Sequence, residues 1–198
     1  GSTMTVRTVG IISPGEMGAA IGKVLRGGTL DTVTCLEGRS ELTRMRAKEA
    51  GIRDVPTLDD LVRESDLVLS VLVPSEAVAL AGRVADSIRR TGARPVYADC
   101  DAIAPQTVAR ISRVMADSGV TFIDAGIIGS PPRAGRHNTR IYCSGPDTSA
   151  MESLAECGLD VRVVGSEIGQ ASGLKMVYAA STKGTTALWT ELMVAARA

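Results

Sequence analysis

Residues Val6 to Gly18 read Val-Arg-Thr-Val-Gly-Ile-Ile-Ser-Pro-Gly-Glu-Met-Gly, and a helical pattern follows directly. This pattern predicts an apolar strand that enters a tight turn and then a helix. Free backbone N–H groups and the positive end of a helix dipole meet at such a turn, and a pyrophosphate binds there. The usual dinucleotide fingerprint is G-x-G-x-x-G, with Ser13 here at the place of the first glycine. The candidate cofactor-binding residues of this loop are Ser13, Pro14, Gly15, Glu16, Met17 and Gly18.

The composition is that of an ordinary globular chain of 198 residues, with 44% hydrophobic and 22% charged residues. Aromatic residues make up only 3%, so the core is built from aliphatic side chains, which suits a buried parallel sheet. The formal net charge is zero, which gives no general electrostatic reason to bind nucleic acid or a membrane surface. Without an apolar run of membrane-spanning length or a signal-peptide pattern, we expect a cytoplasmic protein.

The four cysteines do not predict a metal site. They are isolated in the sequence, without a C-x-x-C pair, and the chain has one histidine. Metal-binding sites usually show closer ligand spacing, so we expect no metal and reduced thiols inside or near the strands.

Strand-like and helix-like segments alternate through the first two thirds of the chain. Repeated β-α-β units with aliphatic strands predict an α/β fold, a Rossmann-type doubly wound and mostly parallel sheet. The predicted strands are Val6–Ser13, Thr32–Glu37, Ile52–Val55, Asp66–Val73, Arg94–Ala98, Val120–Ala125, Arg140–Ser144 and Val161–Val164. The predicted helices are Glu16–Arg26, Glu41–Ala50, Leu58–Glu64, Glu76–Arg89, Pro105–Asp117 and Thr148–Cys157.

The composition and pattern of the sequence change after residue 125. Gly126–Asn138 is rich in Gly, Pro and Arg and is predicted to be a loop. From about Glu167 one long helical pattern runs to Ala198 without proline or a capping glycine. We therefore expect a Rossmann domain over residues 4–165, and over residues 166–198 an interdomain helix that starts a shortened or truncated all-α C-terminal domain.

The spacing of these motifs resembles the β-hydroxyacid dehydrogenase superfamily, which includes 6-phosphogluconate dehydrogenase and the imine reductases. The resemblance covers roughly Val6 to Gly184, and Met17-Gly18 fits the family's loop although Ser13 departs from it. It implies an oxidoreductase that passes a hydride between a nicotinamide cofactor and a carbon bearing O or N.

The end of the second strand bears on the choice between NADP and NAD. Glu37 stands about 20 positions past the loop, where an acidic residue takes the ribose 2′-OH of NAD. Arg39-Ser40 resembles the pair carried by relatives that prefer NADP, and a guanidinium suits the 2′-phosphate. We favour NADP, with NAD possible. A solvated Arg39 is the alternative.

Two further strand ends match the family's cofactor site. The resemblance places the stretch Leu72-Val73-Pro74 beside the nicotinamide ribose, although a buried strand stopped by Pro74 explains it equally well. Asp99 follows the next strand, and ligands of open α/β sheets collect at these ends. Asp99 could instead cap the following helix.

The substrate residues are where the chain departs most from the family. Its Ser-Gly-Gly loop corresponds here to Ile128-Gly129-Ser130, so the hydroxyl that would bind a substrate carboxylate is missing or moved. The basic stretch that follows is either an anion pocket or an exposed loop. That stretch contains Arg133, Arg136, His137 and Arg140.

On the long helix, the resemblance implies a catalytic lysine at Lys175, with a surface lysine as the alternative. The family's asparagine four residues later is Ala179 here, and helical spacing puts Tyr178 and Thr182 on the stripe of Lys175. Tyr178 is the second candidate catalytic residue, and Thr182 is a candidate substrate residue.

The leading hypothesis is an NADP-dependent oxidoreductase that acts on a small, relatively apolar substrate. A non-catalytic NAD(P)-binding or sensor module is the alternative, and a methyltransferase-like domain explains the long helix less well. An apolar cluster near the end of the chain predicts a homodimer through this helix. The cluster contains Leu188, Trp189, Leu192 and Met193.

Overall fold

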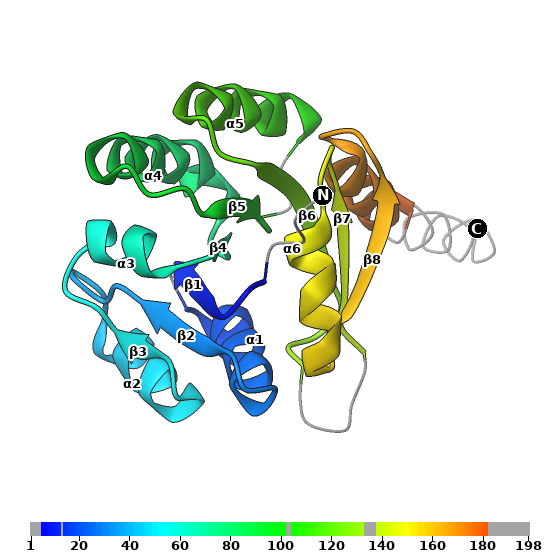
Figure 1. Ribbon diagram of the computed structural model, residues 1–198. Coiled ribbons are helices and arrows are strands. Elements are labelled where there is room, and N and C mark those ends of the chain that lie inside the picture. The colour runs from blue at the N-terminus through cyan, green and yellow to red at the C-terminus, as the bar shows by residue number, and fades with distance from the viewer. Residues whose placement is uncertain (1–4, 13, 102–103, 133–137, 182–198) are drawn as a thin grey trace, which may run out of the picture.

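The computed structural model describes residues 5–12, 14–101, 104–132 and 138–181, which form an eight-stranded sheet with helices on both faces (Figure 1). The order across the sheet is β3-β2-β1-β4-β5-β6-β7-β8. The strands are β1 (Thr8–Ile12), β2 (Asp31–Thr34), β3 (Arg53–Asp54), β4 (Leu67–Ser70), β5 (Val96–Asp99), β6 (Phe122–Ile128), β7 (Arg140–Ser144) and β8 (Asp160–Gly165).

The topology confirms the predicted Rossmann-type, mostly parallel sheet. The six strands from β3 to β6 in this order are parallel, and the order reverses between β1 and β4. Strand β7 runs antiparallel to β6, and β8 is parallel to β7. In open sheets of this kind the ligand lies outside the carboxyl ends of the strands, at the point where the order reverses.

Helices cover both faces of the sheet, as Figure 1 shows. One core cluster joins the sheet to α1, α2 and α6, and the other joins it to α3, α4 and α5. The helices are α1 (Glu16–Gly27), α2 (Glu41–Ala50), α3 (Leu58–Glu64), α4 (Ala77–Thr91), α5 (Pro105–Ser118) and α6 (Ser149–Glu152), with 3-10 turns η1 (Pro74–Glu76) and η2 (Ser153–Cys157).

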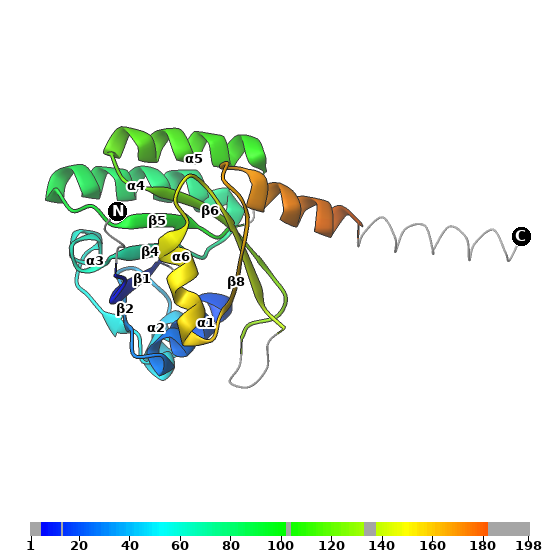
Figure 2. The same cartoon turned by 45° about the vertical axis from the view of Figure 1, so that its right-hand side comes forward.

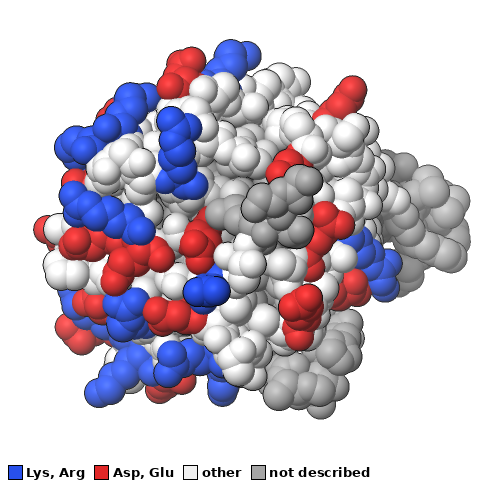
Figure 3. Space-filling view, viewed as in Figure 1, with Lys and Arg blue, Asp and Glu red and all other residues white. Residues whose placement is uncertain are grey.

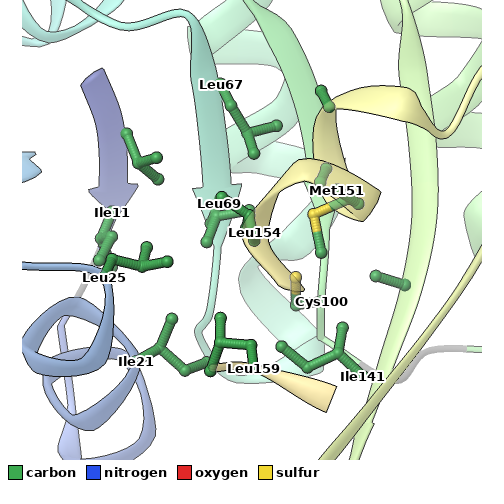
Figure 4. Packing of buried hydrophobic residues seen from close by; sticks show 14 of the residues in the cluster. Ile11, Ile21, Leu25, Leu67, Leu69, Cys100, Ile141, Met151, Leu154 and Leu159 are labelled. Atoms are coloured by element: carbon green, nitrogen blue, oxygen red, sulfur yellow. The ribbon is translucent and has the colours of Figure 1, made fainter. Parts of the chain in front are cut away.

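The core is aliphatic, as the composition predicts. Figure 4 shows Leu67 and Leu69 of β4 among side chains from α1, the segment around α6, and neighbouring strands. Leu67 is fully buried and Leu69 nearly so. Burial of side chains this size is worth roughly 1.5–3 kcal/mol each, so the packing fixes the strands that carry the site.

Side-chain caps place two helices at their predicted bounds. The Ser40 hydroxyl accepts a hydrogen bond from the Thr43 N–H at the start of α2, and Thr57 does the same for Asp60 in α3. Gly51 closes α2 with φ +74°, a left-handed conformation that favours glycine.

The predicted loop from Gly126 to Asn138 is wrong at its start. Strand β6 continues to Ile128, because residues 124–128 pair with the antiparallel strand β7. The Ile128–Arg140 pair is the last of this ladder. The predicted helix Thr148–Cys157 also divides into α6 and the 3-10 turn η2. The composition of residues 126–128 does not reveal that they pair with β7.

The predicted long helix begins at residue 170 and is helical to residue 181, the last described position. It starts beside the β6–β8 side of the sheet and points away from it (Figure 2). Among the described residues, no helix is long and apolar enough to cross a membrane. The division at residues 165 and 166 stays a prediction.

Candidate functional site

A row of buried polar side chains crosses the carboxyl edge of the parallel strands. The strand register pairs Ser70 with Asp99, Asp99 with Asp124, and Asp124 with Ser144. Each of the four residues is at most 1% exposed. Buried polar side chains need hydrogen-bond partners. The segments that pack against this row therefore supply those partners.

Asp124 and Ser144 hold the start of helix 170–181. Asp124 Oδ2 accepts hydrogen bonds from the Gly169 and Ser172 N–H groups, each at 3.0 Å, and Oδ1 accepts one from the Ser172 hydroxyl at 2.5 Å. Ser144 Oγ accepts from the Ala171 N–H at 3.0 Å. Burial raises the pKa of Asp124, and the hydrogen bonds from Ser172 oppose that shift. A negative cap at a helix N-terminus also complements the helix dipole.

Lys175 follows this anchored turn, and its stem lies against β6 at Gly126. A methyl group at Gly126 would stand 3.3 Å from Lys175 Cβ and 3.4 Å from Lys175 Cδ, so the missing side chain makes room for the lysine. Lys175 is partly buried. Burial lowers the pKa of its ammonium, while the nearby Cys100 and Asp101 act to raise it.

Asp101 follows β5 and ties it to the end of β4. Its Oδ2 accepts from the Ser70 hydroxyl and its Oδ1 from the Leu72 N–H, each at 2.7 Å. The Asp101 backbone also pairs with Gly126, the residue over which Lys175 lies. Burial, followed by repulsion from Asp99, raises the pKa of Asp101 to about 8.

Asp99 lies at the end of β5, as expected, and does not cap the next helix. Its Oδ1 accepts from the Asp101 N–H at 2.9 Å, and α5 begins after Ala104 without a side-chain cap. Asp99 Oδ2 is buried and has no hydrogen-bond partner among the described residues. Burial raises the pKa of this carboxyl to about 6.

Sequence reasoning missed Asp101 and Asp124. Each is a single acidic residue in or next to an apolar strand, and such a residue is most simply interpreted as a surface or cap residue. The signal that could have found Asp124 is its place inside the aliphatic segment Phe122–Ile128, because a carboxylate there must be paired.

The predicted glycine loop lies at the N-terminus of α1, the twelve-residue helix after β1. Pro14 and Gly18 are buried, Glu16 is exposed, and Gly15 and Met17 are intermediate. No described side chain caps α1, and a methyl group built on Gly15 has no atom within 4 Å. The first amides of α1 are therefore open to an anion, which fits a pyrophosphate. Ser13 lies outside the described residues.

Arg39 and Ser40 lie together between β2 and α2. The turn before them contains Gly38 at φ +73°, and the Arg39 N–H donates to the Leu36 carbonyl. The Ser40 hydroxyl caps α2, while the Arg44 guanidinium donates to the same Leu36 carbonyl. This end of β2 therefore holds two cations and a helix N-terminus, a suitable set for a phosphate.

The Leu72–Pro74 segment follows β4, and the Leu72 N–H donates a hydrogen bond to Asp101. Val73 is 56% exposed, and Pro74 begins the 3-10 turn η1. The segment thus passes from a buried strand end to an exposed residue, and the hydrogen bond of Leu72 links it to Asp101.

The predicted substrate residues Ile128, Gly129 and Ser130 lie at and just after the end of β6. Gly129 has φ +113°, and a methyl group there would overlap the Asn138 carbonyl oxygen. The Ser130 carbonyl accepts from the Thr139 hydroxyl, which ties the two ends of this turn. These residues are on the strand that supports Lys175, beyond Gly126.

Tyr178 is 56% exposed, whereas Lys175 is partly buried, so the predicted stripe has one buried and one exposed member. Thr182 lies outside the described residues, as do Arg133, Arg136 and His137 of the basic stretch.

The surface charge is mixed. Basic and acidic side chains are interspersed over the helices on the face shown in Figure 3. Within the described ranges, no three or more His, Cys, Asp or Glu side chains are arranged to hold a metal ion.

Comparison with known proteins assigns this arrangement to a family. Residues 8–157 match the family described as the NAD-binding domain of 6-phosphogluconate dehydrogenase. The chain belongs to this family. The predicted superfamily is therefore confirmed.

Similar proteins extend the likeness over nearly the whole chain. A 28.5 kDa protein of Methanothermus fervidus described as uncharacterized is 29% identical over 184 residues, which is 93% of this chain and 68% of that protein. A conserved protein of unknown function, whose structure is described as similar to 3-hydroxyacid dehydrogenases, is 34% identical with a TM-score of 0.84. The match covers 96% of this chain and 70% of that one.

An imine reductase from Myxococcus stipitatus, solved with NADP+, shares the fold. The TM-score is 0.77 at 19% identity, and the match covers 93% of this chain and 63% of that one. A variant of the same enzyme was solved with NAD+. The family membership makes this chain an NAD(P)-binding domain of the dehydrogenase type.

Proposed function

We propose that the protein is an NADP-dependent oxidoreductase that transfers a hydride to or from a C–O or C–N centre of a small, relatively apolar substrate. The observation that carries the proposal is the placement of Lys175 over Gly126, next to Asp101 at the carboxyl edge of an NAD-binding sheet. Dinucleotides bind outside the carboxyl ends of the strands in such folds.

The described residues fit the dinucleotide at two strand ends, those of β1 and β2. The open space at Gly15 and the uncapped α1 N-terminus suit the pyrophosphate. Arg39 and Ser40 suit a 2′-phosphate, with Arg44 beside them as a second cation, and this supports NADP over NAD. Glu37 is exposed in the turn before Arg39 and is the residue that would favour NAD.

Lys175 is proposed to donate or accept the proton at the substrate heteroatom through its Nζ. A lysine acts as a general acid near neutral pH when burial lowers its pKa, and burial is the largest influence on Lys175. The bound nicotinamide would supply the hydride, so the protein has to orient the substrate and manage this proton. Tyr178, on the next turn, is the second candidate for that proton transfer.

The proposed preference for an apolar substrate rests on β6. Ile128 lies two residues after Gly126, and alternation along a strand puts the two residues on the same face, the one that supports Lys175. Its side chain has no hydroxyl or charge with which to bind a carboxylate. Ketones and imines are therefore better candidates than a sugar acid. Gly129, Ser130 and Thr182 are the other proposed substrate residues.

A homodimer through the C-terminal helix is also proposed. Three large apolar side chains on helix 170–181, namely Leu174, Met176 and Val177, are between 40% and 66% exposed. Exposed apolar side chains on one helix are typical of a surface that contacts a partner.

The direct experiment mixes the protein with NADPH or NADH and a panel of ketones and imines, and follows the absorbance of the reduced nicotinamide. Lys175→Ala is compared with Lys23→Ala, because Lys23 is an exposed lysine of α1. The proposal expects turnover with NADPH that Lys175→Ala lowers by about 100-fold or more and Lys23→Ala leaves unchanged. Turnover unaffected by Lys175→Ala contradicts the assigned role.

A second candidate function is a non-catalytic NAD(P)-binding or sensor module. The absence of a hydroxyl at Ile128 and of an amide at Ala179 favours it, because the resemblance places substrate-binding groups at both positions. Tight NADPH binding without turnover across the panel would support this function.

A further inference from the structure

The two carboxyl groups of Asp99 and Asp101 lie next to each other in the buried end of β5. Asp99 is 1% exposed and Asp101 5% exposed. Asp99 Oδ1 accepts from the Asp101 N–H, whereas the two oxygens of Asp101 accept from the Ser70 hydroxyl at the end of β4 and from the Leu72 N–H just after it. The first of these hydrogen bonds holds the Asp99 carboxyl against the backbone of Asp101.

One oxygen of this pair has no donor. Asp99 Oδ2 is buried without a hydrogen-bond partner among the described residues. A buried acceptor left unpaired destabilises the folded protein, and more so when it carries charge. The Ser70 hydroxyl already donates to Asp101, and the Leu72 N–H does too. A proton on the neighbouring carboxyl is the donor that would satisfy it.

We propose that Asp99 and Asp101 share a single proton at neutral pH, and that this pair is the acidic group that Lys175 faces. Two adjacent buried carboxylates repel each other, so one of them keeps its proton when the other ionises. The shared proton leaves the pair with one negative charge.

The surrounding groups agree with this arrangement. Burial is the largest cause that raises the pKa of both carboxyls, to about 6 for Asp99 and about 8 for Asp101, and repulsion between the acidic groups adds to it. The titratable groups that face the pair are Tyr97 and Cys100 of the same strand segment, Asp124 of β6, and Lys175 of helix 170–181.

The pair is tied to Lys175 through Gly126, which bridges the Asp101 backbone and lies under the lysine stem. With the proton in place, Lys175 faces one negative charge. When the pair loses the proton, a second negative charge favours the ammonium and makes Lys175 a weaker acid. This step rests on the proposed role of Lys175, whereas the shared proton does not. Asp99 and Asp101 are thus positioning residues that set the charge of the site.

The test is a carboxyl-carbon NMR titration of the full chain labelled at aspartate, without cofactor or substrate. Asp101→Asn and Asp99→Asn assign the signals, because an amide can replace the protonated carboxyl and still donate to its neighbour. Asp117→Asn, at an exposed position of α5, is the control. One carboxyl of the pair is expected to titrate above pH 7 in the parent protein, and that step is expected to vanish in Asp101→Asn.

The Lys175 Nζ titration is recorded in the same samples. Its midpoint is expected to be lower in Asp101→Asn than in the parent protein and unchanged in Asp117→Asn. The shared proton is overturned if no aspartate carboxyl of the parent protein titrates above pH 7, a result that needs neither an assignment nor a folded variant. The titration measures no turnover, so it tests the shared proton even if the activity assay shows no turnover. A titration without the expected step would contradict the shared proton and would leave the proposed oxidoreductase activity untouched.

Discussion

The Ser172 hydroxyl donates a 2.5 Å hydrogen bond to Asp124 Oδ1, which joins helix 170–181 to β6 across 48 positions of the chain. The same carboxylate accepts from the backbone N–H of Ser172 and of Gly169. These bonds fix the first turn of the helix that carries Lys175. The geometry of the proposed proton donor therefore depends on an acidic residue of the Rossmann sheet.

Asp124→Ala should loosen the helix that carries Lys175. It leaves the part-buried N–H of Gly169 and the buried donors of Ser172 unpaired, at a cost of about 1–3 kcal/mol in the free energy of unfolding. Hydrogen exchange of these two amides should accelerate, while the amides of β1 keep their protection. Asp117→Ala is the matched control, since Asp117 is exposed. Unchanged exchange at Gly169 and Ser172 would show that Asp124 does not hold the helix.

Gly15→Ala should separate cofactor binding from stability. A methyl group at Gly15 meets no atom within 4 Å, so the fold should tolerate it, but it enters the space proposed for the pyrophosphate. Calorimetry should show NADPH affinity lowered by about tenfold or more, with the melting temperature nearly unchanged. Gly27→Ala, at the other end of α1, also meets no atom within 4 Å and should leave affinity intact. Equal affinities for the two variants would place the pyrophosphate elsewhere.

Arg39→Ala should change the preference between the two dinucleotides. If the guanidinium binds the 2′-phosphate, its loss weakens NADPH binding by about 1.5–3 kcal/mol and affects NADH little. Fluorescence titration with each dinucleotide measures the ratio. Arg83→Ala, which replaces an exposed arginine of α4, serves as the control. An equal loss of affinity for NADPH and NADH would contradict the proposed contact between Arg39 and the 2′-phosphate.

Gly126→Ala should displace Lys175. The added methyl group would stand 3.3 Å from Lys175 Cβ, which is tighter than most such contacts, and 3.4 Å from the Ala171 carbonyl oxygen. A shift of about 1 Å at a reacting group lowers turnover by up to roughly 100-fold. Gly82→Ala in α4 meets no atom within 4 Å and is the comparison. Full turnover in Gly126→Ala would mean that the lysine stem is free to move aside.

The acidic pair predicts how stability depends on pH. The folded-state pKa values of Asp99 and Asp101, about 6 and about 8, lie above the ordinary value of 3.8. The folded protein then binds more protons than the unfolded chain between about pH 4 and 8, so stability falls as the pH rises. The slope is up to about 1.4 kcal/mol per pH unit for each extra proton.

Urea unfolding of the parent protein and of Asp101→Asn at pH 5 and pH 8 isolates this contribution. The variant should lose less stability between the two pH values, because the amide that replaces the Asp101 carboxyl does not ionise. Identical losses in both proteins would mean that Asp101 ionises as an ordinary surface carboxyl does.

Much of the fold was predictable because local signals agree with it. The bounds of α2 follow from the cap at Ser40 and the left-handed Gly51, and α3 from the cap at Thr57. The extension of β6 to Ile128 was not predictable, since it depends on pairing with β7. Strand pairing of this kind is a long-range property that local composition does not record.

The candidate site was predictable only in part. Gly15 lies directly before α1, and Lys175 lies on helix 170–181, as the predicted helices require. Asp101 and Asp124 had no role assigned from the sequence. Their importance comes from burial and from partners 29 to 48 positions away in the sequence. A single sequence does not reveal such partners.

The role of Lys175 in proton transfer is tested by single-turnover oxidation of NADPH by the parent protein and by Lys175→Ala, with a reactive ketone or imine in excess. Lys175→Ala is expected to bind NADPH with unchanged affinity and to transfer hydride at least about 100-fold more slowly at pH 7. A hydride-transfer rate equal to that of the parent protein would contradict that role.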